Sequence, residues 1–172
     1  DLNAWYIRES PTPDLVEPVL PFLEEHGISH PDRNKLIQAL ETVKARSRTL
    51  QEMAEGVGFY FRPPSSYDEK GDRKFLKQNA LGPLQELQER LSSWEDFSEA
   101  GLESFFKAYL EEKEIKLGKI AQPLRVALTG KTASPGLFEI MRVLGKDEVL
   151  RRIDAVLLHI QGKLEETGTQ AP

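Results

Sequence analysis

The sequence predicts an all-α protein with little or no sheet, arranged as two packed helical subdomains. Apolar residues recur at helical spacing along most of the chain, most regularly from Leu102 to Leu110. Patterns that begin helices, such as Thr-Pro, Ser-Pro and Thr with Glu three residues later, separate these apolar series. The run from Phe59 to Phe61 is typical of a strand, but it is too short to support a sheet.

Three helices are expected in the first part of the chain, over about 12–27, 30–43 and 49–56. A Thr-Pro pair begins the first helix, and Pro18 and Pro21 predict that it is kinked or short. The second carries leucines and a valine on one face. Gly56 and Gly58 are expected to end the third.

Consecutive prolines in the segment 62–66 predict a linker, because they are incompatible with a continuing helix. We therefore assign residues 1–66 to a first helical subdomain, 67–165 to a second, and 166–172 to a polar, disordered tail. The helices expected in the second subdomain span about 66–76, 82–91, 98–110, 123–129, 135–144 and 147–160.

Composition excludes several classes of protein. The chain has no cysteine, which excludes disulfides and cysteine-based zinc sites and is compatible with a cytoplasmic location. Its three histidines lack the spacing of metal ligands, so no metal site is expected. There is no apolar stretch of membrane-spanning length and no secretion signal at the first residue, so no membrane partner is expected.

Charge is distributed unevenly along the chain, although the formal net charge is −5. Residues 33–49 carry five basic side chains and one acidic one, and residues 113–146 carry seven basic and two acidic ones. Residues 84–106 between them carry six acidic side chains and one basic one. Two basic segments could form a split surface for a polyanion, or each could be an ordinary solvated helix face.

The most unusual stretch of sequence runs from Leu117 to Ile140. Two helix starts are expected there, at Pro123 and at Pro135, and Arg125 lies one helical turn after Gln122. Free N–H groups at a helix start favour phosphates or base-edge acceptors, and nearby apolar side chains offer a surface for an unstacked base. The alternative is an ordinary capped helix pair whose Leu137 and Phe138 lie in the core.

This stretch resembles a signature of bacterial glutamyl-tRNA synthetases. The resemblance continues in order through residues 2–8, 44–50, 67–76, 144–146 and 151–153, so it covers nearly the whole chain. It implies a class I enzyme whose N-terminal Rossmann-type catalytic domain is followed by a stem-contact region and two helical anticodon-binding subdomains. This chain resembles the last portion, beginning inside the junction with the stem-contact region.

The two ATP-site motifs of class I synthetases do not occur in the sequence. The resemblance therefore implies that the chain binds tRNA without catalysing a reaction, and that it has no catalytic residue and no cofactor of its own. ATP and Mg²⁺ would serve the full-length enzyme, a ligase that charges glutamate tRNA with glutamate. The implied partners are the anticodon loop of that tRNA and the catalytic domain of the same protein, in a monomer.

The resemblance also implies roles for individual residues. Gln122 and Arg125 match positions that hydrogen-bond the second and third anticodon bases, and Arg46 matches a position that senses the third base. Arg48 is the substitute for Arg46 if the alignment slips by two residues. The turn that contacts the first and second bases corresponds to Ser134, Pro135, Gly136, Leu137 and Phe138. Weaker candidates, for phosphate contacts, are Lys119, Lys131 and Arg8.

Two alternatives to this hypothesis remain. The helical C-terminal region of a class I lysyl-tRNA synthetase has a similar architecture, although the elements at 122–125 and 134–138 favour glutamate. A helical interaction module that binds no RNA would agree with the acidic net charge.

Overall fold

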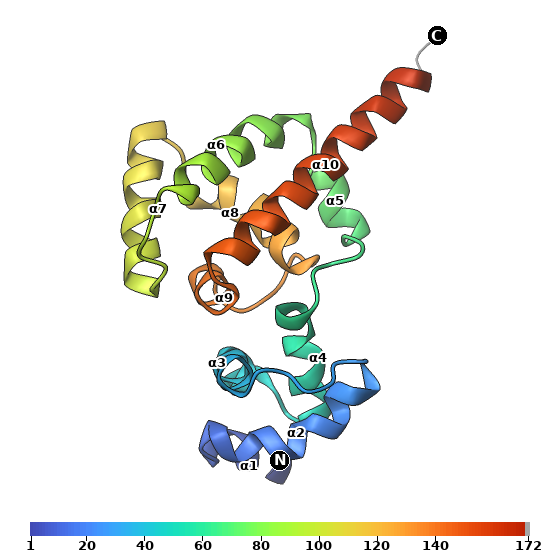
Figure 1. Cartoon of the computed structure of the whole chain (residues 1–172), viewed down its shortest axis with the longest axis vertical. Helices are drawn as coiled ribbons and strands as arrows, with labels where there is room; N and C mark the ends of the chain where they lie inside the picture. The colour runs from blue at the N-terminus through green and yellow to red at the C-terminus, as the bar shows by residue number, and fades with distance from the viewer. Residues whose placement is uncertain (171–172) are drawn as a thin grey trace. The chain divides into compact units, whose positions relative to one another are not determined.

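Residues 1–170 are described by the computed structural model, and helices account for nearly all of their regular structure (Figure 1). Those residues contain no strand, which confirms the all-α prediction. The chain divides into two compact units, Asp1–Pro63 and Pro64–Pro172. Their boundary lies in the proline-containing linker. The assignment of residues 1–66 and 67–165 to two recognition subdomains stays a prediction.

The first unit is built from short helices. They are α1 (Leu2–Glu9), α2 (Thr12–Glu25), α3 (Arg33–Val43), the 3-10 turn η1 (Lys44–Arg46) and α4 (Leu50–Phe61). Helix α2 packs against both α3 and α4, and it buries Leu15, Val19 and Leu23 completely. It stays helical through Pro18 and Pro21. Burial of its apolar face offsets the backbone hydrogen bonds that these prolines remove.

Helix α4 differs from the prediction, because it continues through Gly56 and Gly58 to Phe61. The strand-like run from Phe59 to Phe61 is therefore the last turn of a helix. Tyr60 is fully buried, and its hydroxyl lies 2.8 Å from the Oγ1 atom of Thr42. A Cβ atom at Gly56 would lie 3.3 Å from Val43, so glycine permits close approach of α3 and α4. Packing outweighs the low helix propensity of glycine here.

The described part of the second unit, residues 64–170, contains seven helical elements. They are α5 (Glu69–Phe75), η2 (Gln78–Ala80), α6 (Leu81–Ser92), α7 (Glu99–Lys113), α8 (Leu117–Thr129), α9 (Leu137–Leu144) and α10 (Lys146–Gln170). Helix α10 packs along α6, α8 and α9, while α5 packs on α8 and α7 on α9 (Figure 1). As expected, Ser98 caps α7 by accepting a hydrogen bond from the backbone N–H of Gly101.

Two other helices begin later than the sequence predicts, because an aspartate caps each of them. Asp32 accepts a hydrogen bond from the N–H of Lys35 at 2.9 Å and begins α3, although the sequence suggested a start at His30. Asp68 accepts one from the N–H of Gly71 at 2.8 Å and begins α5. A carboxylate is a strong N-cap and also interacts favourably with the helix dipole.

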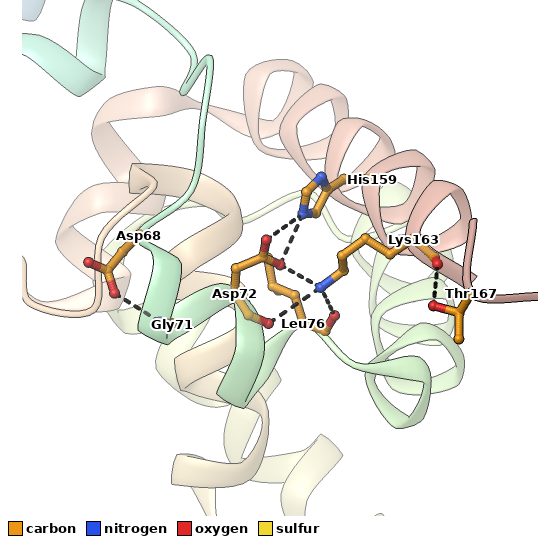
Figure 2. A network of polar contacts seen from close by, with 7 residues as sticks. All are labelled: Asp68, Gly71, Asp72, Leu76, His159, Lys163 and Thr167. Atoms are coloured by element: carbon orange, nitrogen blue, oxygen red, sulfur yellow. Dashed lines mark hydrogen bonds and ion pairs between the residues drawn. The ribbon is translucent and has the colours of Figure 1, made fainter. Parts of the chain in front are cut away.

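Helix α10 extends beyond the end predicted near residue 160. Its later turns are held by Asp72 of α5, whose carboxylate lies 2.9 Å from Nε2 of His159 and 2.6 Å from Nζ of Lys163 (Figure 2). Lys163 also donates to the carbonyl of Leu76 at 2.7 Å, at the end of α5. The predicted disordered tail, 166–172, overlaps the helix at 166–170, and residues 171 and 172 lie outside the described residues.

The contacts of Asp72 make the attachment of α10 to α5 sensitive to acid. Burial acts to raise the pKa of Asp72, but the hydrogen bonds and positive charges of Lys163 and His159 outweigh it and hold the pKa below its ordinary value. The ionised carboxylate is thus favoured in the folded protein. Its contribution to stability is present above the ordinary pKa of aspartate, and it is lost as the pH falls through the lowered pKa.

We predict that Asp72→Asn lowers the free energy of unfolding of the second unit at pH 7 by about 1–2 kcal/mol, because two charge-assisted hydrogen bonds that water partly screens are lost. The difference from the wild type should shrink towards zero at an acidic pH below the lowered pKa of Asp72, where the native carboxyl is protonated. Denaturant titration at both pH values measures it. Glu103→Gln, an exposed carboxylate of α7, is the control. An equal loss at both pH values would contradict the ionic explanation.

Candidate nucleic-acid interface

Helix α8 carries the first candidate element, but it does not begin where the sequence predicts. The expected start at Pro123 is wrong, since α8 begins at Leu117 and Pro123 lies inside it. A proline in a helix interior costs about 3 kcal/mol. The burial of Ile120, Leu124 and Leu128 in the core of the second unit offsets this cost. Gln122 and Arg125 therefore project from the middle of a continuous helix rather than from its first turn.

Arg125 connects α8 to the turn that precedes α9. Its Nη1 atom donates to the carbonyl oxygen of Pro135 at 2.8 Å and also to the hydroxyl of Ser134. The Ser134 hydroxyl lies 2.9 Å from the same carbonyl. The two elements that the sequence singled out are thus in direct contact. Part of the guanidinium positions the turn, which leaves fewer of its donors for a ligand.

Gln122 lies one helical turn before Arg125, and its amide is unusual. The side chain is half-buried, and its Oε1 atom is buried without a hydrogen-bond partner in the described part of the chain. Buried polar atoms without a partner are rare, and each costs about 1–3 kcal/mol. The fold itself therefore leaves this acceptor unsatisfied.

The start of α9 also differs from the prediction, because the helix begins at Leu137 with Gly136 as its N-cap. Glycine has no side chain to accept the free amides. Instead the carboxylate of Glu139 accepts a hydrogen bond from the N–H of Gly136 at 3.1 Å. This negative charge stands at the positive end of the helix. It therefore disfavours a phosphate there.

Sequence reasoning overlooked Glu139 as part of this turn. The signal was present, since a small residue followed three positions later by Glu is the pattern of a reciprocal helix cap.

The apolar residues of the turn divide between core and surface. Pro135 and Leu137 are buried, and the burial of Leu137 agrees with the core interpretation for that residue. Phe138 remains half-buried, and its ring stacks on the buried ring of Phe106 with the centroids 5.2 Å apart. Among the candidates in the turn, Gly136 is exposed, and Ser134 and Phe138 are half-buried. These three residues can therefore contact a ligand.

The remaining candidates are exposed basic side chains. Arg46 lies at the end of η1, at the C-terminal end of α3, and Arg48 follows it with its backbone N–H donating to Glu52 at 2.8 Å. These two residues and Arg8 belong to the first unit, whereas Lys119 and Lys131 belong to the second. None of the five forms an ion pair with another described residue, so their charges face solvent.

Other kinds of site lack support within the described residues. They contain no group of three or more histidine, aspartate or glutamate side chains that could hold a metal ion. None of the helices described is long and apolar enough to cross a membrane.

Fold and geometry together define a helical module in which Arg125 of α8 tethers the turn before α9. The family model described as "Anticodon binding domain" matches residues 14–157. The chain belongs to this family of anticodon-binding domains.

Among individual relatives, the glutamate–tRNA ligase of Geobacter sulfurreducens is 44% identical over 160 residues, which cover 93% of this chain and 34% of that protein. The glutamate–tRNA ligase of Thermus thermophilus is 41% identical over 157 residues, or 91% of this chain and 33% of that protein. The chain thus spans about a third of the length of the curated relatives it matches. The resemblance to bacterial glutamyl-tRNA synthetases seen in the sequence is confirmed.

Solved structures of glutamate–tRNA ligases are also similar to this chain. A glutamate–tRNA ligase from Elizabethkingia meningosepticum matches with a TM-score of 0.83 and 25% identity, over 92% of this chain and 31% of that one. The corresponding synthetase from Elizabethkingia anophelis matches with a TM-score of 0.77 and 26% identity, over 90% of this chain and 30% of that one.

We predict that Gln122→Met leaves the free energy of unfolding unchanged or raises it by up to about 1 kcal/mol, since an unpartnered acceptor is removed from the interior. Gln88→Met is the matched control, because the Gln88 amide donates to the carbonyl of Leu150 at 3.3 Å and its loss should be destabilising. Thermal and denaturant unfolding measure both. A clear destabilisation by Gln122→Met would assign that amide a structural role.

Proposed function

We propose that this chain reads the anticodon of glutamate tRNA as part of a glutamate–tRNA ligase. The observation that carries the proposal is the junction of α8 and α9, where Arg125 holds the turn at Ser134 and Pro135 and the Gln122 acceptor is left without a partner. Single-stranded RNA loops are recognised by such edge hydrogen bonds combined with a stacking surface. Phe138 supplies that surface.

The proposed whole enzyme activates glutamate with ATP and Mg²⁺ in a catalytic domain of the same protein and transfers it to the tRNA. In this scheme the chain supplies recognition without catalysis and acts in the cytoplasm within a monomer. The names of the relatives favour glutamate over the class I lysyl alternative. The alternative, a helical interaction module that binds no RNA, is tested by measuring tRNA binding.

In this proposal, different residues of the chain contact different parts of the anticodon loop. Gln122 and Arg125 address the edges of the second and third bases, and the turn at Ser134 to Phe138 addresses the first and second. Arg125 acts partly by fixing the position of the turn, because one of its nitrogens is already bonded to it. Lys119, Lys131 and Arg8 serve as phosphate contacts that hold the RNA without reading its sequence.

We predict that the chain binds glutamate tRNA more tightly than the same tRNA with a mutated anticodon, and that Arg125→Ala removes most of the difference. Loss of one base-reading contact should cost about 1–3 kcal/mol. Arg125→Lys keeps the charge but loses the planar donor fork, so it should behave like Arg125→Ala in discrimination. Filter binding over a range of salt concentrations measures both effects.

Lys107→Ala, an exposed lysine of α7, is the control for loss of a positive charge. Equal affinity for the two tRNAs, unchanged by Arg125→Ala, would favour the interaction module and end the anticodon-reading hypothesis.

Arg46 is the proposed sensor of the third base. Cytosine presents O2 and N3 acceptors to a guanidinium, whereas guanine presents N1–H and N2–H donors at the corresponding edge. An exposed arginine at the end of η1 would therefore favour glutamate anticodons, which end in C, over glutamine anticodons, which end in G.

We predict that Arg46→Gln in the full-length enzyme increases the charging of glutamine tRNA with glutamate relative to glutamate tRNA. Aminoacylation assays with the two purified tRNAs measure the ratio. Arg48→Gln is the comparison, because it changes the same charge two residues away. If Arg48→Gln shifts the ratio and Arg46→Gln does not, the role passes to Arg48, and if neither does, the third base is read elsewhere.

A further inference from the structure

A groove of about 560 Å³ lies in the second unit, between the end of α5, the start of α6 and the first half of α8. Its apolar walls come from Phe75, Ala80, Pro83, Ile115, Ile120 and Pro123. The volume lies in the range of small-molecule sites, which are mostly apolar with a few polar groups that fix orientation. Rings of phenylalanine and proline give the groove flat walls, and such walls suit the face of a nucleobase.

Charge at the groove is of one sign. Lys74 and Lys119 line it, and no acidic residue is among the side chains that do so in the described part of the chain. Both lysines are exposed, and neither forms an ion pair with another described residue. The ammonium group of Lys74 lies 5.3 Å from the centroid of the Phe75 ring, so charge and aromatic surface are adjacent. In a chain of net charge −5, this pairing is complementary to an anion that also carries a flat apolar face.

The groove and the candidate anticodon site share one helix, α8. Gly118 lines the groove, and Gln122 and Arg125 follow it at positions i+4 and i+7 on the same helix face. Lys119 and Arg125 are separated by about 9 Å along the helix axis. A single-stranded loop whose bases reach Gln122 and Arg125 therefore passes close to the groove. No such contact elsewhere on α8 would bring an acidic peptide to the same place.

We propose that this groove binds a nucleotide of the anticodon loop that lies outside the base triplet. Its base packs between Phe75, Pro83 and Pro123, and its phosphate lies between the ammonium groups of Lys74 and Lys119. The inference rests on the proposed function, since it takes the RNA to be the ligand. It assigns Lys74, Phe75 and Gly118 a part in RNA binding, and it gives Lys119 a defined partner.

Gly118 offers a substitution that fills the groove without disturbing the fold. A Cβ atom at this position meets no atom within 4 Å, and the residue lies in the first turn of a helix, where glycine is less favourable than other residues. Gly118→Phe should therefore place a ring in the groove and leave the unfolding temperature unchanged or higher. Gly118→Ala adds only a methyl group and is its matched control.

The test is equilibrium binding of the 172-residue chain to a synthetic RNA hairpin that carries the anticodon stem and loop of glutamate tRNA. Gly118→Phe is expected to weaken binding roughly 5- to 150-fold, the range for loss of one stacked base, and Gly118→Ala less than about twofold. Lys74→Ala and Lys119→Ala should each reduce the slope of log affinity against log salt by about 0.7, whereas Lys107→Ala should not. Chemical probing should show one loop nucleotide outside the triplet that the wild type protects and Gly118→Phe does not, with the triplet still protected.

The outcomes separate this inference from the proposed function. If the wild type binds the hairpin and Gly118→Phe binds it equally well with the same protections, the groove is not a nucleotide site and anticodon reading still stands. A smaller salt slope in the lysine variants, with no effect of Gly118→Phe, would also overturn the proposal, because it would show a phosphate contact without a bound base. If the wild type does not bind the hairpin, the proposed function and this inference fail together.

Discussion

Burial of α8 is the constraint on which the rest of the second unit depends. Eight of the thirteen residues of this helix are buried, among them Ile120, Leu124, Val126, Ala127 and Leu128. The hydrophobic free energy of that burial keeps the helix continuous through Pro123 and fixes its rotation in the core. The positions left at its surface then follow from helical periodicity. Gly118, Gln122 and Arg125 fall on one face because the opposite face is committed to the core.

Charged side chains refine the geometry of the turn that the burial of α8 places beside the helix. Arg125 donates to Ser134 and Pro135, and Glu139 accepts from Gly136, so charged side chains satisfy the turn from both ends. Fixing the turn in advance reduces the entropy lost when a ligand binds. The carboxylate at the start of α9 places negative charge at this turn, whereas Lys74 and Lys119 place positive charge beside the start of α8. The two ends of α8 thereby differ in the charge that they offer to an RNA in the proposed function.

Much of this arrangement could be predicted from the sequence, and the failures have physical causes. Periodicity predicted the all-α class and the long apolar face of α7, and the Ser98 cap was evident because its pattern is local. Sequence reasoning treated Pro123, Gly56 and Gly58 as helix ends, since propensity is a local quantity and the tertiary burial that overrides it is not. The length of α10 depends on Asp72, which lies 91 residues before Lys163 in the sequence. At the site, the pairing of Arg125 with Ser134 joins helix α8 to the turn before α9, and a groove formed by α5, α6 and α8 has no linear pattern.

Dividing the candidate contacts between two units has a consequence for affinity. Arg46 lies in the first unit, and Gln122, Arg125 and the turn lie in the second, with the prolines of the 62–66 segment between them. Each unit alone offers few contacts to an RNA loop, but once one of them is bound, the short linker keeps the other at a high effective concentration. Prolines restrict the conformations of that linker and so lower the entropy lost when both units engage. In the proposed function the third base is addressed from both units, by Arg46 and by Gln122 with Arg125, whereas the first and second bases are addressed from the second unit alone. A change of the third base would therefore remove contacts from both units and cost the most binding energy.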